Sequence, residues 1–167
     1  MKDIKILVIN LGSTSTKIAY YINNECVGSG SVTHDLEQIK ATKDVIDQYG
    51  FRKEAVLEFM KTHNISLDEL DSLTTRGGQT EPIEGGTYKI NEEMVGQVRS
   101  GEYGHHVCGV GVLIAYDLCK ESDHAVAMTT DTPTTDEMDE IAKYSGLPEI
   151  QRVSCVQALN TKAMARY

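Results

Sequence analysis

The residues best suited to chemistry are the polar ones between positions 10 and 17. This segment reads Asn10-Leu-Gly-Ser-Thr-Ser-Thr-Lys17 and follows an apolar run. A turn of this composition brings together backbone N–H groups, hydroxyls and a cation, which are the groups that bind phosphate. We therefore expect a phosphate-binding turn that includes Gly12, Ser13, Thr14 and Ser15. Glycine, serine and threonine also form ordinary polar hairpin turns, and the composition alone leaves that alternative open.

This turn differs from a Walker A loop. In that motif a Gly-Lys pair is followed by Ser or Thr and then by a helix. Here residues 18–22 read Ile-Ala-Tyr-Tyr-Ile, a composition typical of a strand. The sequence thus predicts phosphate binding between two strands.

Two further loops carry groups that complement the turn. Arg76 stands before two glycines at the end of an apolar segment, and an arginine can bind a carboxylate or a phosphate through two hydrogen bonds. Asp131 follows another apolar segment, and a carboxylate there could hold Mg²⁺ or orient a nucleophile. Arg76 could instead form a structural ion pair. Asp131 and Asp136 could be turn or helix-capping residues; we favour this structural interpretation for Asp136 and a functional role for Asp131.

The elements that position these loops form an α/β pattern. The sequence predicts three strands joined by hairpins, with a turn at Asn23-Asn24, and then two strands reached through helices. Together they give a mixed five-stranded sheet with helices on its faces. The expected strands are residues 4–10, 17–22, 25–33, 70–75 and 124–129.

Apolar periodicity predicts the helices between and after these strands. Asn91 is expected to cap one of them and Gly101 to end it, while Gly109 and Gly111 are expected to permit close packing of another. The expected helices are residues 35–48, 51–60, 91–99, 103–121, 136–144 and 153–166, with a short capped helix beginning at Ser66.

Composition limits the classes of function. The chain has 167 residues, a formal net charge of −9 and a mean hydropathy of −0.30. An acidic chain disfavours non-specific binding to nucleic acid or anionic membranes. No segment is long enough to span a bilayer and no signal peptide is evident, so we expect a cytoplasmic protein. The four cysteines lack zinc or disulfide spacing and are expected to be reduced.

An ordered set of motifs extends over essentially the whole chain, and it resembles the N-terminal half of butyrate kinases. These belong with acetate kinases to the group that shares the ribonuclease-H-like, actin-like ATPase domain of actin, hexokinase and Hsp70. The motifs are residues 10–17, Phe51-Arg52-Lys53, Arg76-Gly-Gly, residues 82–88, residues 99–104, Asp136-Glu-Met138 and residues 145–150.

The resemblance implies a reaction and a set of roles. Butyrate kinases transfer the γ-phosphoryl group of ATP, with Mg²⁺, to a short-chain carboxylate and form an acyl phosphate. Ser13, Ser15 and Lys17 would contact phosphate, and Asn10 would contact phosphate and metal. Arg76 would hold the substrate carboxylate, and Asp131 would orient Mg²⁺ or the attacking group.

The chain departs from this family in four ways. The segment Gly104-His105-His106-Val107-Cys108-Gly109 replaces a run that in the family is similar to His-Ala-Ser-Asn. Gln157 stands where the family has a histidine that supports the transition state, and glutamine carries no positive charge. Residues 129–135 are rich in threonine where the family is more apolar. Family members are also about twice as long, as two-domain chains are.

We therefore expect residues 1–167 to form the N-terminal domain of a two-domain kinase, with the second domain absent and little turnover alone. The missing domain or a second copy could act as partner. The main alternative is a non-catalytic binding or regulatory module that kept the fold.

Overall fold

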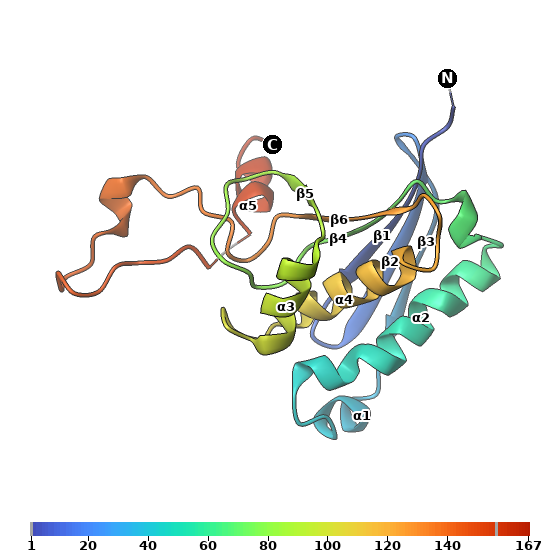
Figure 1. The fold of residues 1–167 in the computed structure, drawn as a ribbon, viewed down its shortest axis with the longest axis horizontal. Coiled ribbons are helices and arrows are strands. Elements are labelled where there is room, and N and C mark those ends of the chain that lie inside the picture. Colours follow the sequence, from blue (N-terminus) through green and yellow to red (C-terminus); the bar gives the residue numbers. More distant parts are fainter. Residues whose placement is uncertain (1, 156) are drawn as a thin grey trace.

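The computed structural model describes residues 2–155 and 157–167, which form a mixed sheet flanked by helices (Figure 1). Within these residues the sheet has six strands in the order β3-β2-β1-β4-β6-β5. β1 pairs in parallel with β4 and β4 with β6, whereas the pairs β1–β2, β2–β3 and β5–β6 are antiparallel. The strands are β1 (Lys5–Leu11), β2 (Ser15–Ile22), β3 (Glu25–Thr33), β4 (Ser72–Thr75), β5 (Thr87–Lys89) and β6 (Val126–Thr130).

The α/β class and the mixed sheet are confirmed, but the expected number of five strands was wrong. The additional strand, β5, has three residues and pairs with the end of β6. A segment this short shows no alternation from which a strand could be predicted. The hairpin at Asn23 is confirmed, since this residue has a left-handed φ of 54° between β2 and β3.

The helices differ from expectation mainly in length. Asn91 caps α3 through the Met94 N–H and Gly101 ends it in the left-handed conformation, both as predicted. The predicted helix 35–48 is divided into α1 and a 3-10 turn, because Asp44 caps a new turn through the Ile46 N–H. The helices are α1 (Leu36–Lys40), α2 (Tyr49–Thr62), α3 (Glu92–Ser100), α4 (Val107–Cys119) and α5 (Ala158–Met164), with short 3-10 turns η1 (Val45–Gln48), η2 (Leu67–Glu69) and η3 (Glu140–Lys143).

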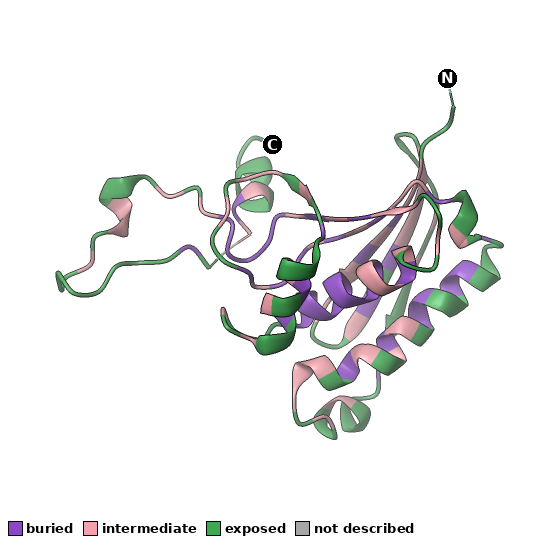
Figure 2. Cartoon of the chain, viewed as in Figure 1, coloured by how far each residue is buried: buried purple, intermediate pink, exposed green. Residues whose placement is uncertain are grey.

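The last two predicted helices need the largest corrections. In the segment 136–144 only η3 is helical, because the Asp136 carboxylate accepts the Met138 N–H and forms an isolated turn. Residues 136–153 form an arm that projects from the sheet, and most of it is exposed (Figures 1 and 2). The predicted helix 153–166 shortens to α5, and its position 156 lies outside the described residues.

The core lies on one face of the sheet. Alternate residues of β1 (Leu7, Ile9 and Leu11) are buried there, where α4 packs against β1 and α2 against β2, whereas Val8 and Asn10 on the other face are partly exposed. Gly78 and Gly109 let the loop after β4 approach α4: a Cβ on Gly78 would lie 2.6 Å from the Gly109 Cα. The expectation of close packing at Gly109 is therefore confirmed. α5 stands on the partly exposed face.

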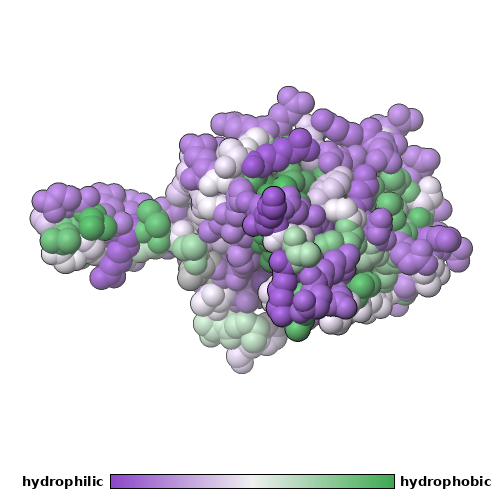
Figure 3. All heavy atoms as spheres, turned by 90° about the horizontal axis from the view of Figure 1, so that it is seen from below, coloured by the Kyte–Doolittle hydropathy of each residue, from purple (hydrophilic) through white to green (hydrophobic). Residues whose placement is uncertain are grey.

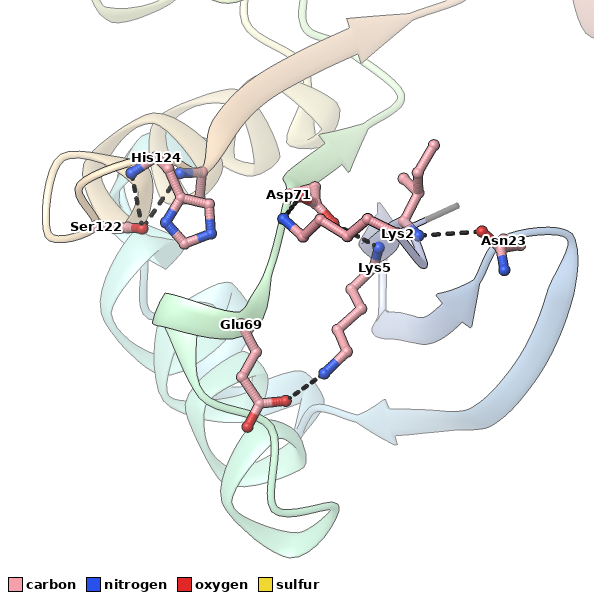
Figure 4. Close-up of polar contacts among 9 residues, drawn as sticks. Lys2, Lys5, Asn23, Glu69, Asp71, Ser122 and His124 are labelled. Carbon is pink, nitrogen blue, oxygen red and sulfur yellow. Dashed lines mark hydrogen bonds and ion pairs between the residues drawn. The ribbon is translucent and has the colours of Figure 1, made fainter.

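A polar cluster fixes the N-terminal ends of β1 and β4 (Figure 4). The Asp71 carboxylate accepts hydrogen bonds from the Lys2 Nζ at 2.8 Å and from the Lys5 N–H at 2.9 Å. The Lys5 Nζ lies 2.7 Å from the Glu69 carboxylate. The hydrogen bonds from the Lys2 Nζ and the Lys5 N–H lower the pKa of Asp71. The cluster lies where β1 pairs with β4, at the end opposite to Asn10.

The surface of the projecting arm is unusually apolar. Ile141, Tyr144, Leu147, Ile150 and Val153 are all exposed. In the space-filling view the arm extends from the body with apolar side chains on its surface (Figure 3). Among the described residues no helix is both long and apolar enough to cross a membrane.

Candidate functional site

Three of the predicted site residues meet at one edge of the sheet. Since β1, β4 and β6 are mutually parallel, their C-terminal ends lie together. Asn10 is near the end of β1, Arg76 follows β4 and Asp131 follows β6. All three line a cavity of about 370 Å³. Ligands in open α/β sheets bind outside such strand ends, so this cavity is the candidate site.

Lys17 faces a second hollow that adjoins the first. It is the cross-strand partner of Asn10 in the β1–β2 pair, so both side chains lie on the same face of the sheet. The second hollow has a volume of about 460 Å³, and Asn10 and Val8 line both hollows. Asn10 therefore stands between the exposed Lys17 cation and the cavity that holds Arg76.

The turn between β1 and β2 is closed by a hydrogen bond of 2.8 Å from the Gly12 N–H to the Ser15 carbonyl. Ser13 and Thr14 at its tip are exposed. Within residues 2–155 and 157–167 the N–H groups of Ser13 and Thr14 have no acceptor. The turn thus presents two unused donors, but Gly12, Ser13, Thr14 and Ser15 are not among the residues that line the two hollows.

Arg76 is a cation with no protein partner among residues 2–155 and 157–167. In the described part of the chain its guanidinium forms neither an ion pair nor a hydrogen bond. Its charge acts on Cys108, where burial raises the pKa of the thiol and the Arg76 guanidinium opposes that rise. The chain turns after Arg76 through Gly77, whose φ of 72° favours glycine. The structural ion pair considered as an alternative for Arg76 is absent from the described residues.

Asp131 is buried and has a left-handed φ of 51°, a conformation that few residues other than glycine adopt. Its carboxylate accepts the N–H groups of Leu159 at 2.8 Å and Asn160 at 3.2 Å. These are donors in the first turn of α5, where a carboxylate is also favoured by the helix dipole. Asp131 therefore caps α5 from a distant loop and fixes that helix beside the cavity.

Gln157 lies next to the cavity but outside the set of residues that line it. It occupies the N-cap position of α5, is half-buried, and its side chain caps no N–H group. Its backbone carbonyl accepts the Thr161 N–H. The wall that α5 contributes consists instead of Leu159, Asn160 and Ala163, which we did not predict as site residues. Their spacing on one face of a helix was the available signal.

The threonine-rich stretch forms a buried hydroxyl cluster beside Asp131. Thr132, Thr134 and Thr135 are buried, and the Thr132 Oγ1 lies 3.2 Å from the Thr135 Oγ1. The Thr134 Oγ1 accepts the Thr80 N–H. Asp136 follows this cluster and pairs with Lys143 at 3.1 Å. The structural interpretation of Asp136 is confirmed as a turn residue, since its carboxylate accepts the Met138 N–H, but it does not cap a helix.

The residues present offer few ligands for a metal ion. No group of three or more His, Cys, Asp or Glu side chains that could hold one is found among the described residues. The cavity is lined by one carboxylate, that of Asp131, and by the side-chain amides of Asn10 and Asn160. This donor set fits Mg²⁺, which is often held by one or two protein oxygens together with substrate phosphates and water.

A larger hollow, about 740 Å³, lies elsewhere. It is bounded by β3, α1 and α2, with Phe51, Glu54 and Lys61 among its lining residues. It contains none of the predicted site residues. The predicted chemical groups therefore gather at the smaller of these two cavities.

Comparison with known proteins supports this fold. No protein-family model matches the sequence. The structure is similar to acetate kinase from Entamoeba histolytica, with a TM-score of 0.57 and 10% identity over 87% of this chain and 39% of that chain. It is also similar to acetate kinase from Porphyromonas gingivalis, with a TM-score of 0.56 and 14% identity over 98% of this chain and 49% of that chain.

Because the sequence identities are this low, these similarities support the fold alone. The chain has the α/β architecture expected for an actin-like ATPase domain. It spans less than half the length of each of these two kinases.

Proposed function

We propose that this chain forms half of the active site of a carboxylate kinase of the butyrate kinase type. The reaction transfers the γ-phosphoryl group of ATP to a short-chain carboxylate and gives ADP and an acyl phosphate. The observation that carries the proposal is the convergence of Asn10, Arg76 and Asp131 on one cavity beside Lys17. Phosphoryl transfer depends mainly on positioning and charge stabilisation, and these residues offer both.

Each residue has a role that its surroundings permit. The free N–H groups of Ser13 and Thr14, with the hydroxyls of the turn that includes Gly12 and Ser15, hold phosphate oxygens, and Lys17 neutralises their charge. The unpaired Arg76 guanidinium binds the substrate carboxylate through two hydrogen bonds.

Asn10 and Asp131 supply oxygen ligands for Mg²⁺ at the cavity. When bound, Mg²⁺ would neutralise charge on the phosphates. Asp131 retains lone pairs for this purpose, since each of its oxygens accepts a single N–H. Gln157 would donate a hydrogen bond to the transferring group but could not offer charge.

The proposal includes a second domain that supplies the remaining wall of the site. The two acetate kinases are more than twice as long as the parts that this chain matches. The cavity is open to solvent, and phosphoryl transfer requires that water be kept from the transferring group. We propose that another domain or a partner subunit provides the adenosine-binding wall, and that the protein acts in the cytoplasm. The net charge of −9 disfavours nucleic acid and anionic membranes as partners.

Two measurements test this function. Calorimetry with Mg²⁺–ATP and with butyrate is expected to show binding of each, and Lys17→Ala and Asp131→Ala are expected to weaken the binding of Mg²⁺–ATP. An acyl-phosphate assay with ATP, Mg²⁺ and butyrate is expected to show little product from this chain alone. Binding that is unchanged in both variants would exclude the proposed site, and robust turnover would exclude the need for a second domain.

A second candidate is a non-catalytic binding module with the same fold. The observation that favours it is the engagement of Asp131 by α5, together with the neutral Gln157 at the start of that helix. Such a module would bind the same ligands. Adding the second half of the protein, when identified, would restore acyl-phosphate formation only for the kinase.

A further inference from the structure

A fully buried arginine lies behind the turn between β1 and β2. Arg52, in the first part of α2, has no exposed surface. Its Nη2 donates to the carbonyls of Gly12 at 3.0 Å and Ser13 at 3.1 Å, and its Nη1 donates to the Ser15 carbonyl at 3.0 Å. One guanidinium thus binds three carbonyls of the turn that carries the predicted phosphate donors.

The rest of the guanidinium is held by the side chains around it. The Gln48 Oε1 accepts from Nε at 3.0 Å and from Nη2 at 2.8 Å. The Thr16 Oγ1 lies 3.3 Å from Nη1 and 2.8 Å from the Nε2 of the buried His34. The fork is therefore fixed on both sides, and Arg52 has little freedom to leave the turn.

This cation has no counter-ion among the described residues, because all its acceptors are neutral. Burial accordingly lowers the pKa of Arg52 from its ordinary value. A buried charge that is not paired is costly, and proteins rarely keep one without a compensating group. The side of the turn opposite to Arg52 is where a compensating anion could lie.

The geometry of the peptide unit links the two sides of the turn. In a trans peptide the carbonyl of one residue and the N–H of the next point in opposite directions. Cis peptide bonds are absent from the described residues. Because Arg52 binds the carbonyls of Gly12 and Ser13, the N–H groups of Ser13 and Thr14 must point away from it. They are the two donors without an acceptor in the described structure.

We infer that Arg52 is a positioning residue for a phosphate group: it holds the turn so that the Ser13 and Thr14 N–H groups face outward together, and its buried charge favours an anion against them. Consecutive outward N–H groups form an anion-binding concavity. The inference rests on the proposed phosphotransferase function and adds a residue that does not touch the substrate. Arg52 acts entirely through the backbone of the turn.

The test is a titration of the ¹⁵N-labelled chain with inorganic phosphate, followed by NMR at the Ser13 and Thr14 amides. We expect saturable shifts in the wild type. Arg52→Met, which keeps the length of the stem without the charge, is expected to weaken phosphate binding at least tenfold. Arg52→Lys keeps the charge but cannot reach three carbonyls, and we expect it to weaken binding two- to fivefold.

The matched control is Val56→Ala in the same helix. Val56 is fully buried in the apolar core, whereas the helix's side-chain hydrogen bonds to the turn come from Arg52, so we expect this variant to lower stability without moving the Ser13 and Thr14 amides. It is expected to bind phosphate as the wild type does. A loss of affinity that follows stability in all variants, including Val56→Ala, would overturn the positioning role.

Two other outcomes separate this inference from the proposed function. If phosphate does not shift the Ser13 and Thr14 amides of the wild type, the phosphate site is wrong and the inference falls with it. If the wild type binds and Arg52→Met binds equally, only the role of Arg52 is overturned. Should Arg52→Met not fold, Arg52→Lys and Gln48→Leu decide, and wild-type affinity in both would overturn the inference.

Discussion

The carboxylate of Asp131 accepts a 2.8 Å hydrogen bond from the Leu159 N–H, although 28 residues separate the two in the sequence. This contact and its neighbour to Asn160 attach α5 to the end of β6. The same carboxylate therefore fixes one wall of the cavity and faces into it. Structure and proposed chemistry depend on one side chain.

Replacing Asp131 by Ala is expected to free the N-terminus of α5. Removal of a capping carboxylate costs about 1 kcal/mol, and a short helix at the edge of the molecule has few other contacts to compensate. Hydrogen exchange of the amides in α5 should accelerate by about fivefold, while exchange in β1 and β4 stays unchanged. Asp131→Asn keeps one acceptor oxygen and should show a smaller effect. Unchanged exchange in α5 would contradict this role.

Replacing Arg76 by Ala is expected to affect binding without affecting stability. Its guanidinium has no partner in the described structure, so the free energy of unfolding should change by less than about 0.5 kcal/mol. Affinity for butyrate should fall about tenfold or more, because one bidentate cation is lost. Calorimetry with butyrate and urea unfolding measure the two effects.

Arg99→Ala is the matched control for this change. Arg99 lies on α3, is exposed and does not line the cavity. Its Nη2 lies 3.9 Å from the Asp117 Oδ2. It should leave butyrate binding unchanged. Equal losses of affinity in Arg76→Ala and Arg99→Ala would indicate a general effect of net charge and remove Arg76 from the site.

The sequence predicted the strand ends better than it predicted their surroundings. An apolar segment ends just before or at each of Asn10, Arg76 and Asp131, so the sequence alone assigns these three residues to strand ends. β5 and the cap on α5 depend on partners distant in the sequence, which local patterns do not carry. The helix expected at 136–144 does not form over its full length, because Ile141, one of its apolar residues, is exposed and packs against no other element of the described structure.

The burial of Arg52 is a second feature that the sequence alone does not predict. A basic residue near the start of an amphipathic helix is usually exposed, so the pattern of residues 51–60 gives no sign that Arg52 is buried. Its burial follows from the three carbonyls that the neighbouring turn directs toward it. The turn itself was predicted, but the residue that holds it was not.

The buried His34 predicts a dependence of stability on pH. Burial, and to a smaller extent the Arg52 charge, lowers its pKa below the ordinary value of 6.5. Since the unfolded chain takes up this proton first, the free energy of unfolding should fall as the pH drops below about 6.5. His34→Gln removes the titrating group and should flatten this part of the profile. Urea unfolding between pH 8 and pH 5 measures it.

The titration of Asp71 and Asp136 does not contribute to the change in the free energy of unfolding between pH 8 and pH 5. The pKa values of Asp71 and Asp136 are lowered from 3.8 by hydrogen bonds and cations, so the stability that they contribute is lost only at lower pH. The difference between the wild type and His34→Gln isolates the histidine from other titrating groups. Parallel pH profiles for the two proteins would show that His34 is not held in its neutral form.

Two glycines with opposite surroundings test the packing of the loop that carries Arg76. A Cβ on Gly78 would lie 2.6 Å from the Gly109 Cα and 3.0 Å from a Val98 methyl, so Gly78→Ala should destabilise the fold by about 1–3 kcal/mol. Gly96 lies within α3 with nothing within 4 Å of its Cβ position, so Gly96→Ala should stabilise by about 0.5–1 kcal/mol. Urea unfolding measures both.

The difference in the free energy of unfolding between Gly78→Ala and Gly96→Ala tests the packing of the loop that carries Arg76. Both changes add one methyl group and reduce the freedom of the unfolded chain, so that contribution is shared and cancels in the comparison. What remains is the contact between the loop after β4 and α4. If Gly78→Ala were as stable as Gly96→Ala, the loop would not be seated against Gly109, and the position of Arg76 at the cavity would lose its structural support.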